Sequence, residues 1–290
     1  MIVARQPSDA PGETGTTGHS WDGIEEYDRP LPKWWLWTFY ACIVWSVGYW
    51  VLMPSFPLVS GYARGLLGYS QREVLMNEMA AARTAQAQYA DRIRSLPLDQ
   101  VRSDPALLEF ALAAGRSAFA VNCSQCHGQG AEGSRGYPNL NDDAWLWGGS
   151  LAAIQQTIGH GIRSSDPETR ESQMPAFLAD GILTAAQVDD AAEFVLSLSG
   201  RTADPAAAER GRTVFAENCA ACHGEGGIGN QEVGAPNLTG AVWLYGSDKA
   251  TIVETVSYAR RGVMPAWQGR LDDATIKSLA VYVHSLGGGQ

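Results

Sequence analysis

Cysteine, histidine and basic residues are all scarce in this sequence of 290 residues. Five Cys are too few for a disulfide-dense secreted scaffold. Lys and Arg total 21 against 31 Asp and Glu, and the resulting net charge of -10 would repel the phosphates of a nucleic acid. The charge therefore argues against binding of nucleic acid. Strand-like alternation of apolar and polar residues is also scarce, so the sequence predicts an all-α protein.

Charge is missing altogether from residues 34–53, which read WWLWTFYACIVWSVGYWVLM. At about 1.5 Å per residue this stretch spans roughly 30 Å, the thickness of a bilayer core. The stretch is longer than the apolar part of a signal peptide, and no persuasive cleavage site follows it, so we predict an uncleaved transmembrane anchor. Trp and Tyr gather toward both ends, as is typical where a span meets lipid headgroups. Cys42 is predicted to be an inert apolar residue of the span.

The polar residues before the anchor, 1–33, show no helical or alternating pattern and are predicted to form a loosely held arm. Arg29 and Lys33 flank the anchor on this side, whereas the first basic residue beyond it is Arg64. The positive-inside rule therefore places the arm in the cytoplasm and the rest of the chain outside. Residues 54–106 are predicted to be a linker that contains one helix, over 71–96.

The remainder of the chain is an internal repeat. The motifs CSQCHG and CAACHG, at 123–128 and 219–224, recur at an offset of 96, and the offset is 98 for two PNL elements. It falls to 90 for two MPA elements, because the first copy has extra residues around SSDPETRES. Each copy ends in a predicted amphipathic helix, over 185–198 and 273–286. We expect two small all-α domains, over 107–200 and 205–290.

The motif CxxCH occurs once in each repeat. Its residues are Cys123, Cys126 and His127 in the first repeat and Cys219, Cys222 and His223 in the second. Two Cys at this spacing can each form a thioether to a haem vinyl group, and the following His is then aimed at the iron. The alternative, one four-cysteine zinc site, leaves the matched His residues unexplained. The pattern therefore favours two covalently attached haem c groups.

A methionine follows each motif in an MPA element, Met174 in the first repeat and Met264 in the second. A single Met at such a place would more often pack in the core of the protein. An MPA element at the same place in both repeats favours a role for Met at the iron. Thioether sulfur is a soft donor, and His/Met ligation fills the sixth position and raises the reduction potential. We predict His127, Met174, His223 and Met264 as axial ligands, and the spacing leaves open which Met serves which iron.

Three other histidines are weaker candidates. His160 lies between the CxxCH and MPA elements of the first repeat, but the second repeat has no counterpart. We therefore expect His160 at the surface or beside the site rather than on the iron. His284 on the last predicted helix and His19 in the arm are expected to be solvated.

The anchor, the helical linker and the paired CxxCH domains with MPA elements resemble the dihaem subunit (subunit III) of cbb3-type cytochrome c oxidases. CxxCH is common to all c-type cytochromes, but the aromatic anchor that starts LPKWWLWTFY and the following GYSQR are more specific. The resemblance implies two tandem class I-like cytochrome c domains in the periplasm, held by a single span in a bacterial inner membrane. It also implies an exchange, with Met264 on the first haem and Met174 on the second.

Small c-type cytochromes suggest roles for four more residues. The carbonyl groups of Pro138 and Pro236, in the PNL elements, are expected to accept a hydrogen bond from the iron-binding His of their repeat, although both could be plain turn residues. Trp145 and Trp243 are expected either beside the haem or in the core.

The resemblance implies a subunit that is not an enzyme by itself and that relays electrons from a cytochrome c or a bc1-type reductase. The implied partners are the haem-copper catalytic subunit, a monohaem cytochrome c subunit and membrane lipid. Five His, none of them in 34–53, are too few for an oxygen-reducing centre in this chain. The alternatives are a dihaem subunit of a periplasmic dehydrogenase, a free membrane electron carrier, a haem-based sensor, and a dihaem peroxidase, which would need an open iron position.

Overall fold

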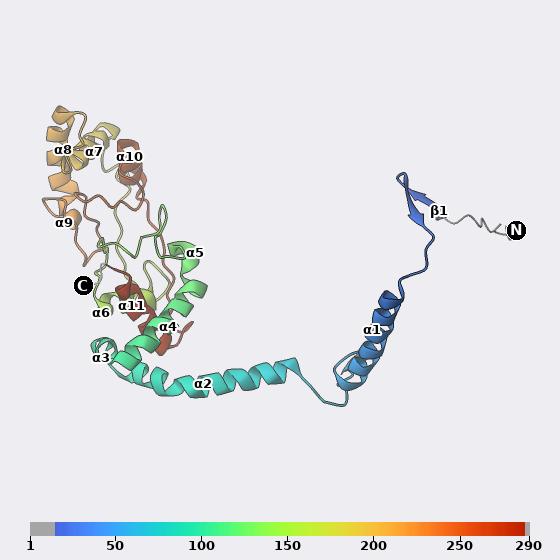
Figure 1. Cartoon of the computed structure of the whole chain (residues 1–290). Helices are drawn as coiled ribbons and strands as arrows, with labels where there is room; N and C mark the ends of the chain where they lie inside the picture. The colour runs from blue at the N-terminus through green and yellow to red at the C-terminus, as the bar shows by residue number, and fades with distance from the viewer. Residues whose placement is uncertain (1–14, 288–290) are drawn as a thin grey trace. The chain divides into compact units, whose positions relative to one another are not determined.

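The computed structural model describes residues 15–287 and is mostly helical (Figure 1). The chain divides into two units, of which the first ends at Ala82 and the second begins at Arg83. Residues 1–14 of the predicted arm lie outside the described residues.

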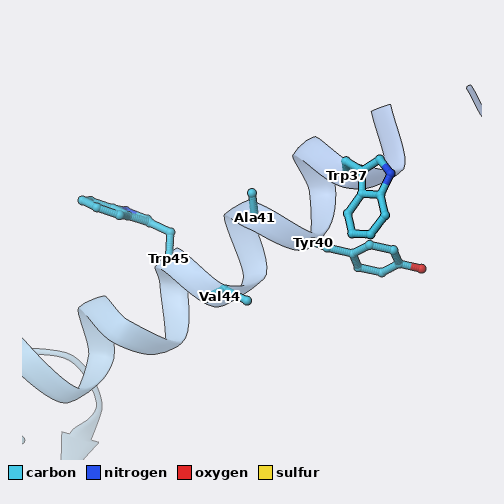
Figure 2. Close-up of a pocket in the computed structure, with 5 residues that line it drawn as sticks. All are labelled: Trp37, Tyr40, Ala41, Val44 and Trp45. Carbon is cyan, nitrogen blue, oxygen red and sulfur yellow. The ribbon is translucent and has the colours of Figure 1, made fainter. Parts of the chain in front are cut away.

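The predicted transmembrane anchor is α1 (Lys33–Leu52), which is long and apolar enough to cross a membrane. None of its residues is buried by the rest of the described chain, so its side chains are available to lipid or to other helices. Trp37, Tyr40 and Trp45 project from its surface around a shallow hollow (Figure 2). The helix ends at Leu52, and the backbone of the next residue, Met53, is extended because Pro54 follows.

A β-hairpin precedes α1, where the sequence predicted an arm without regular structure. Strands β1 (Thr16–Trp21) and β2 (Ile24–Tyr27) pair in antiparallel fashion. They are joined by Asp22 and Gly23, and both of these residues have positive φ. Asp-Gly is a strong signal for this kind of turn, so the hairpin could have been predicted. A second hairpin follows α1 and consists of β3 (Pro57–Leu58) and β4 (Gly61–Tyr62).

The helix predicted over 71–96 is α2 (Gln71–Ser95), which begins in the first unit and ends in the second. The end of the predicted linker is not a linker. It forms a further helix, α3 (Leu98–Ser103), and Ile93 and Val101 are fully buried. The next helix begins at Pro105, so the domain boundary expected at 107 falls inside a helix and the packed core begins earlier.

The remaining helices of the second unit form two cores (Figure 1). The helices are α4 (Pro105–Asn122), α5 (Ser124–His127), α6 (Leu151–His160), α7 (Ala185–Ser197), α8 (Pro205–Asn218), α9 (Ala220–His223), α10 (Lys249–Tyr258) and α11 (Asp273–Ser285). The first core contains α3, α4, α6, α11 and the end of α2. The second core contains α7, α8 and α10 and consists of two adjoining clusters, which share Val253 and Val256 of α10. Cys219 packs against one of these clusters and Met174 against the other.

The last helix of each repeat packs in the core of the other repeat. Helix α11 lies along α4, where Gly115 leaves no room for a side chain beside the backbone of Ser278. Helix α7 lies along α8, where Gly211 is equally close to the backbone of Asp190. The sequence predicted one core for each repeat, whereas each core combines both. The short connection from α7 to α8 favours their pairing, because consecutive helices joined by a short loop pack as neighbours.

Candidate functional site

The first CxxCH motif lies at the junction of α4 and α5. Cys123 ends α4, and its N–H group donates to the carbonyl oxygen of Phe119 at 2.8 Å. The N–H groups of Cys126 and His127 donate back to the carbonyl oxygen of Cys123 at 3.1 and 3.0 Å. The turn stops at Gly128, whose φ of 83° suits glycine. One tight turn therefore holds the two thiols and the imidazole of the motif together.

The second motif has the same local structure at the junction of α8 and α9. Cys219 ends α8, and its carbonyl oxygen accepts from the N–H groups of Cys222 and His223 at 3.1 and 3.0 Å. Gly224 ends this turn with a φ of 74°. The equal geometry of the two turns follows from their matched sequences, including a Gly directly after each His.

Each motif His is held by a proline carbonyl. His127 Nδ1 lies 3.0 Å from the carbonyl oxygen of Pro138, and His223 Nδ1 lies 3.0 Å from that of Pro236. Because a carbonyl oxygen only accepts, Nδ1 carries the proton and donates, and Nε2 keeps its lone pair. Burial lowers the pKa of both histidines, which favours the neutral ring. A neutral imidazole with its Nε2 lone pair available is the form that binds iron.

The cysteines of the two motifs lie in separate cores. Cys123 packs against the first core and Cys219 against the second. Burial, with a smaller contribution from the neighbouring thiol, raises the pKa of each to about 11. Within residues 15–287 no group of three or more His, Cys, Asp or Glu side chains could hold a metal ion. This arrangement does not support the four-cysteine zinc alternative, whereas free paired thiols fit attachment of haem.

The two predicted methionine ligands lie in different cores. Met264 packs against the first core, together with Cys123, and exchanges two backbone hydrogen bonds of 3.0 Å with Ile162. Met174 packs against the second core, near Val214 of α8. Each Met therefore lies in the core of the CxxCH motif from the other repeat.

The side chain of His160 lies beside two carboxylate groups. Its Nδ1 lies 3.0 Å from a carboxylate oxygen of Asp166, and its Nε2 lies 3.5 Å from a carboxylate oxygen of Glu168. Both partners belong to the extra segment that only the first repeat has. His19 is exposed as expected, whereas His284 on α11 is half-buried.

Trp145 and Trp243 are both partly buried. Trp145 packs against the first core, and Trp243 packs against the second. The indole Nε1 of Trp243 donates to the carbonyl oxygen of Gly240 at 2.9 Å. Cys42 lies on the exposed surface of α1.

Sequence reasoning missed a matched pair of arginines. Arg170 Nε donates to the hydroxyl oxygen of Thr157 at 2.8 Å, and its guanidinium lies 5.2 Å from the ring centroid of Trp147. The second repeat has the same arrangement with Arg260, Thr255 and Tyr245. These residues recur at the repeat offsets, so a fuller alignment of the two copies could have found them.

Two CxxCH turns, each with a neutral His and a Met from the other repeat in its core, define a c-type cytochrome with two haem sites. The same chain carries a helix that can cross a membrane. Comparison with known families agrees. Residues 13–60 match the N-terminal domain of cytochrome oxidase-cbb3, FixP. Residues 112–199 match cytochrome c, and residues 206–283 match cytochrome c oxidase, cbb3-type, subunit III.

Similar proteins match the chain along nearly its whole length. The cbb3-type cytochrome c oxidase subunit CcoP of Cereibacter sphaeroides is 54% identical over 281 residues, which cover 97% of both chains. The subunit FixP of Azorhizobium caulinodans is 53% identical over 98% of this chain and 97% of its own. The CcoP subunit of Azospirillum brasilense is 53% identical over 99% of this chain and 100% of its own. The chain belongs to the CcoP/FixP family of cbb3-type cytochrome c oxidase subunits.

Family membership agrees with the prediction from the sequence. The chain is a membrane-anchored electron-transfer subunit of a cbb3-type cytochrome c oxidase, and it carries two covalent haem c groups in two cytochrome c domains. Its role in the oxidase is therefore the transfer of electrons.

Proposed function

We propose that Cys123 and Cys126 attach the first haem through thioethers and that His127 is its first axial ligand. In the same way, Cys219 and Cys222 attach the second haem, and His223 is its first axial ligand. The observation that carries this proposal is the hydrogen bond from each His Nδ1 to a proline carbonyl, which directs the lone pair of the ring to Nε2. The two thiols of each motif are free and lie three residues apart in the sequence, as attachment to two vinyl groups needs.

Met264 completes the first site and Met174 completes the second. The support is that each Met packs against the core in which the other repeat's CxxCH motif lies. When bound, each haem supplies reversible one-electron chemistry at its iron. The chain contributes a soft sulfur donor that favours the reduced iron, and apolar walls that limit the access of water.

The haem domains lie in the periplasm and the N-terminal arm lies in the cytoplasm. The support is the position of Arg29 before α1 and of Lys33 at its first residue, since positive residues flank the cytoplasmic end of a span. The donor is a cytochrome c or a bc1-type reductase. Residues 107–290 carry 12 Lys and Arg against 20 Asp and Glu, which suits a basic donor. The partners in the complex are the haem-copper subunit and a monohaem cytochrome c subunit.

Replacement of Met174 or Met264 by Ala, one at a time, tests these assignments. Each variant should lower the potential of one haem by on the order of 0.1 V, because axial ligands set haem potentials over a wide range. Electron flow from reduced cytochrome c to oxygen should slow in both variants. The measurements are a redox titration and oxygen uptake by the purified oxidase.

Met79→Ala is the control, because Met79 is exposed on α2 and lies far along the chain from either motif. It should leave both potentials unchanged. Wild-type potentials in both the Met174 and the Met264 variants would contradict the axial assignments.

A further inference from the structure

One arginine is bonded to both segments that carry the methionines. Arg163 follows α6, and its Nε donates to the carbonyl oxygen of Gly262 at 2.8 Å. Its Nη1 donates to the carbonyl oxygen of Ser172 at 3.1 Å. Gly262 lies two residues before Met264, and Ser172 lies two residues before Met174. A single guanidinium therefore joins the two segments at equivalent positions of the repeat.

The backbone around Arg163 reaches the same two segments. The N–H of Arg163 donates to the carbonyl oxygen of Arg170 at 2.9 Å, on the chain that leads to Met174. The preceding residue, Ile162, exchanges two hydrogen bonds of 3.0 Å with Met264. A side chain at Gly161 would overlap the backbone of the segment from Met264 to Ala266.

Arg163 adopts a strained backbone conformation in this position. Its φ is 51°, in the left-handed region that residues other than glycine rarely occupy. Such strain persists only where the surroundings hold the residue in place, and it gathers at functional positions. The planar guanidinium suits the task because its fixed donors can bond two carbonyl groups at once, and bonds from a charged donor are stronger than neutral ones.

A second arginine, Arg261, lies near Arg163 but does not share its contacts. At the offset of 90 that aligns the two methionine segments, Arg261 corresponds to Glu171 and not to Arg163, and the described residues show no hydrogen bond or ion pair for it. The two arginines are close enough that Arg261 contributes to lowering the pKa of Arg163, together with the larger effect of burial. Of these two arginines, only Arg163 is therefore hydrogen-bonded to both methionine segments.

We propose that Arg163 is a positioning residue that holds both Met264 and Met174 at their irons and thereby couples the two haem sites. This inference rests on the ligand roles proposed above. A methionine sulfur binds oxidised iron weakly, since this soft donor favours the reduced state. Retention of the ligand in the oxidised protein thus depends on how firmly the chain holds the segment around it.

Imidazole competition in the oxidised, full-length, haem-loaded chain tests this role. Imidazole binds only an iron whose methionine has left, so its apparent affinity follows the fraction of each site that is open. Arg163→Gln removes the charged donors to Gly262 and Ser172. We expect the affinity of both haems for imidazole to rise about tenfold, which corresponds to about 1.4 kcal/mol. The Met–iron charge-transfer absorption of both haems should weaken in parallel.

Three further variants make the result specific. Met174→Ala and Met264→Ala identify which binding phase belongs to which haem. Arg261→Gln removes the same charge beside Arg163 without breaking a bond that the structure shows, and it should leave both imidazole affinities unchanged. Arg163→Lys keeps the charge but not the two-pronged geometry, so it should raise both affinities by less than Arg163→Gln does. If Arg163→Gln does not accumulate with two haems, the Lys variant carries the test.

A response at one haem alone, at neither haem, or equally in Arg261→Gln would overturn the proposal. These results leave the ligand assignments standing as long as Met174→Ala and Met264→Ala each open one site. If the two Met variants leave the affinities unchanged, the ligand assignments fail, and the role of Arg163 fails with them.

Discussion

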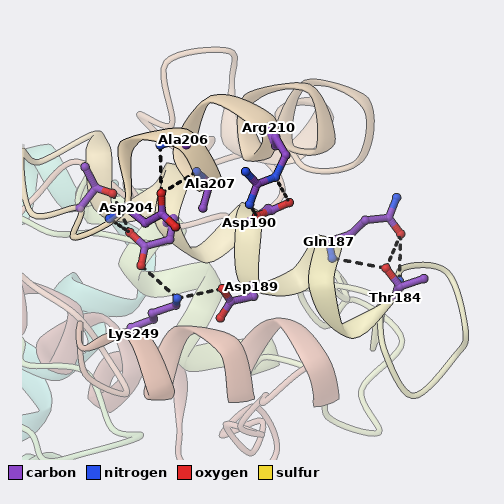
Figure 3. A network of polar contacts seen from close by, with 11 residues as sticks. Thr184, Gln187, Asp189, Asp190, Asp204, Ala206, Ala207, Arg210 and Lys249 are labelled. Atoms are coloured by element: carbon purple, nitrogen blue, oxygen red, sulfur yellow. Dashed lines mark hydrogen bonds and ion pairs between the residues drawn. The ribbon is translucent and has the colours of Figure 1, made fainter.

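Glu193 is a buried carboxylate that holds the second core together, with only 2% of its surface exposed. Its Oε2 accepts from the hydroxyl group of Thr202 at 2.6 Å and from the N–H of Ala203 at 3.2 Å. Its Oε1 lies 3.0 Å from Lys249 Nζ. Lys249 also bonds Asp189 at 2.8 Å, so the ammonium group links α10 to α7 (Figure 3). These contacts, led by the Thr202 hydroxyl, lower the pKa of Glu193 to about 2.

The depressed pKa of Glu193 predicts an acid-sensitive contribution to folding. A group with a lowered folded-state pKa stabilises the fold above its ordinary value of 4.5, and this stabilisation is lost as the pH falls toward about 2. The contribution is on the order of 3 kcal/mol. Glu193→Gln should therefore lower the free energy of unfolding above pH 4.5 and flatten its dependence on pH. Chemical denaturation on both sides of that pH measures both effects.

The control for this prediction is Glu209→Gln on α8. Glu209 pairs with Arg212 at 3.2 Å, but its side chain is 72% exposed, so the pair contributes little. A pH profile of Glu193→Gln that matches the wild type would show that the carboxylate does not stabilise the core.

The proposed iron ligands come from the sequence, whereas the residues that support them could not be predicted. CxxCH and the repeated MPA elements point to haem chemistry from local spacing alone. Arg163 reaches Gly262 and Glu193 reaches Lys249 across long sequence separations, and these partners become neighbours only in the folded chain. A charged residue in a loop or on a helix gives no sign in the sequence of which carbonyl or ammonium group it will meet.

At the scale of elements, two glycines set the distance between the crossing helices. We expect Gly115→Ala to push α11 away from α4, because the new methyl group would overlap the backbone of Ser278 and the side chain of Tyr282. Overpacking of this kind costs about 1–3 kcal/mol. The potential of the haem on Cys123 should shift while the other haem keeps its potential. Thermal unfolding and a redox titration measure the two effects.

Gly211→Ala is the mirror variant of this experiment. It should disturb α7 against α8, and with them the haem on Cys219. Gly226→Ala is the neutral control, because a methyl group there meets only Ile228 at an ordinary distance of 3.8 Å. If Gly115→Ala shifted the haem on Cys219 instead, the helices would not be paired as described.

The bounds of four helices were predictable, but the pairing of helices was not. The uncharged run, the position of Pro97 and the amphipathic pattern fix α1, α2, α7 and α11 to within about one residue. The hairpin of β1 and β2 was missed although Asp22-Gly23 is a known signal. The exchange of α7 and α11 is a different matter, because two similar repeats offer similar surfaces and the hydrophobic pattern fits either partner.

At the scale of the whole molecule, the two haem sites are built as one unit. The N–H of Gly136, near the first motif, donates to the carbonyl oxygen of Leu244 in the second repeat at 2.9 Å. Each core also takes its last helix and its methionine from the other repeat. Neither repeat therefore builds its core alone, and both CxxCH motifs belong to one folded body.

A full-length chain with a single haem tests this exchanged architecture most directly. Cys219→Ala with Cys222→Ala removes the second attachment site and leaves the first haem on Cys123 and Cys126. In this background, Met264→Ala should turn the oxidised haem high-spin and abolish its Met–iron charge-transfer absorption, while Met174→Ala should leave both features intact. The opposite result, a haem that loses its ligand with Met174 and keeps it without Met264, would contradict the account.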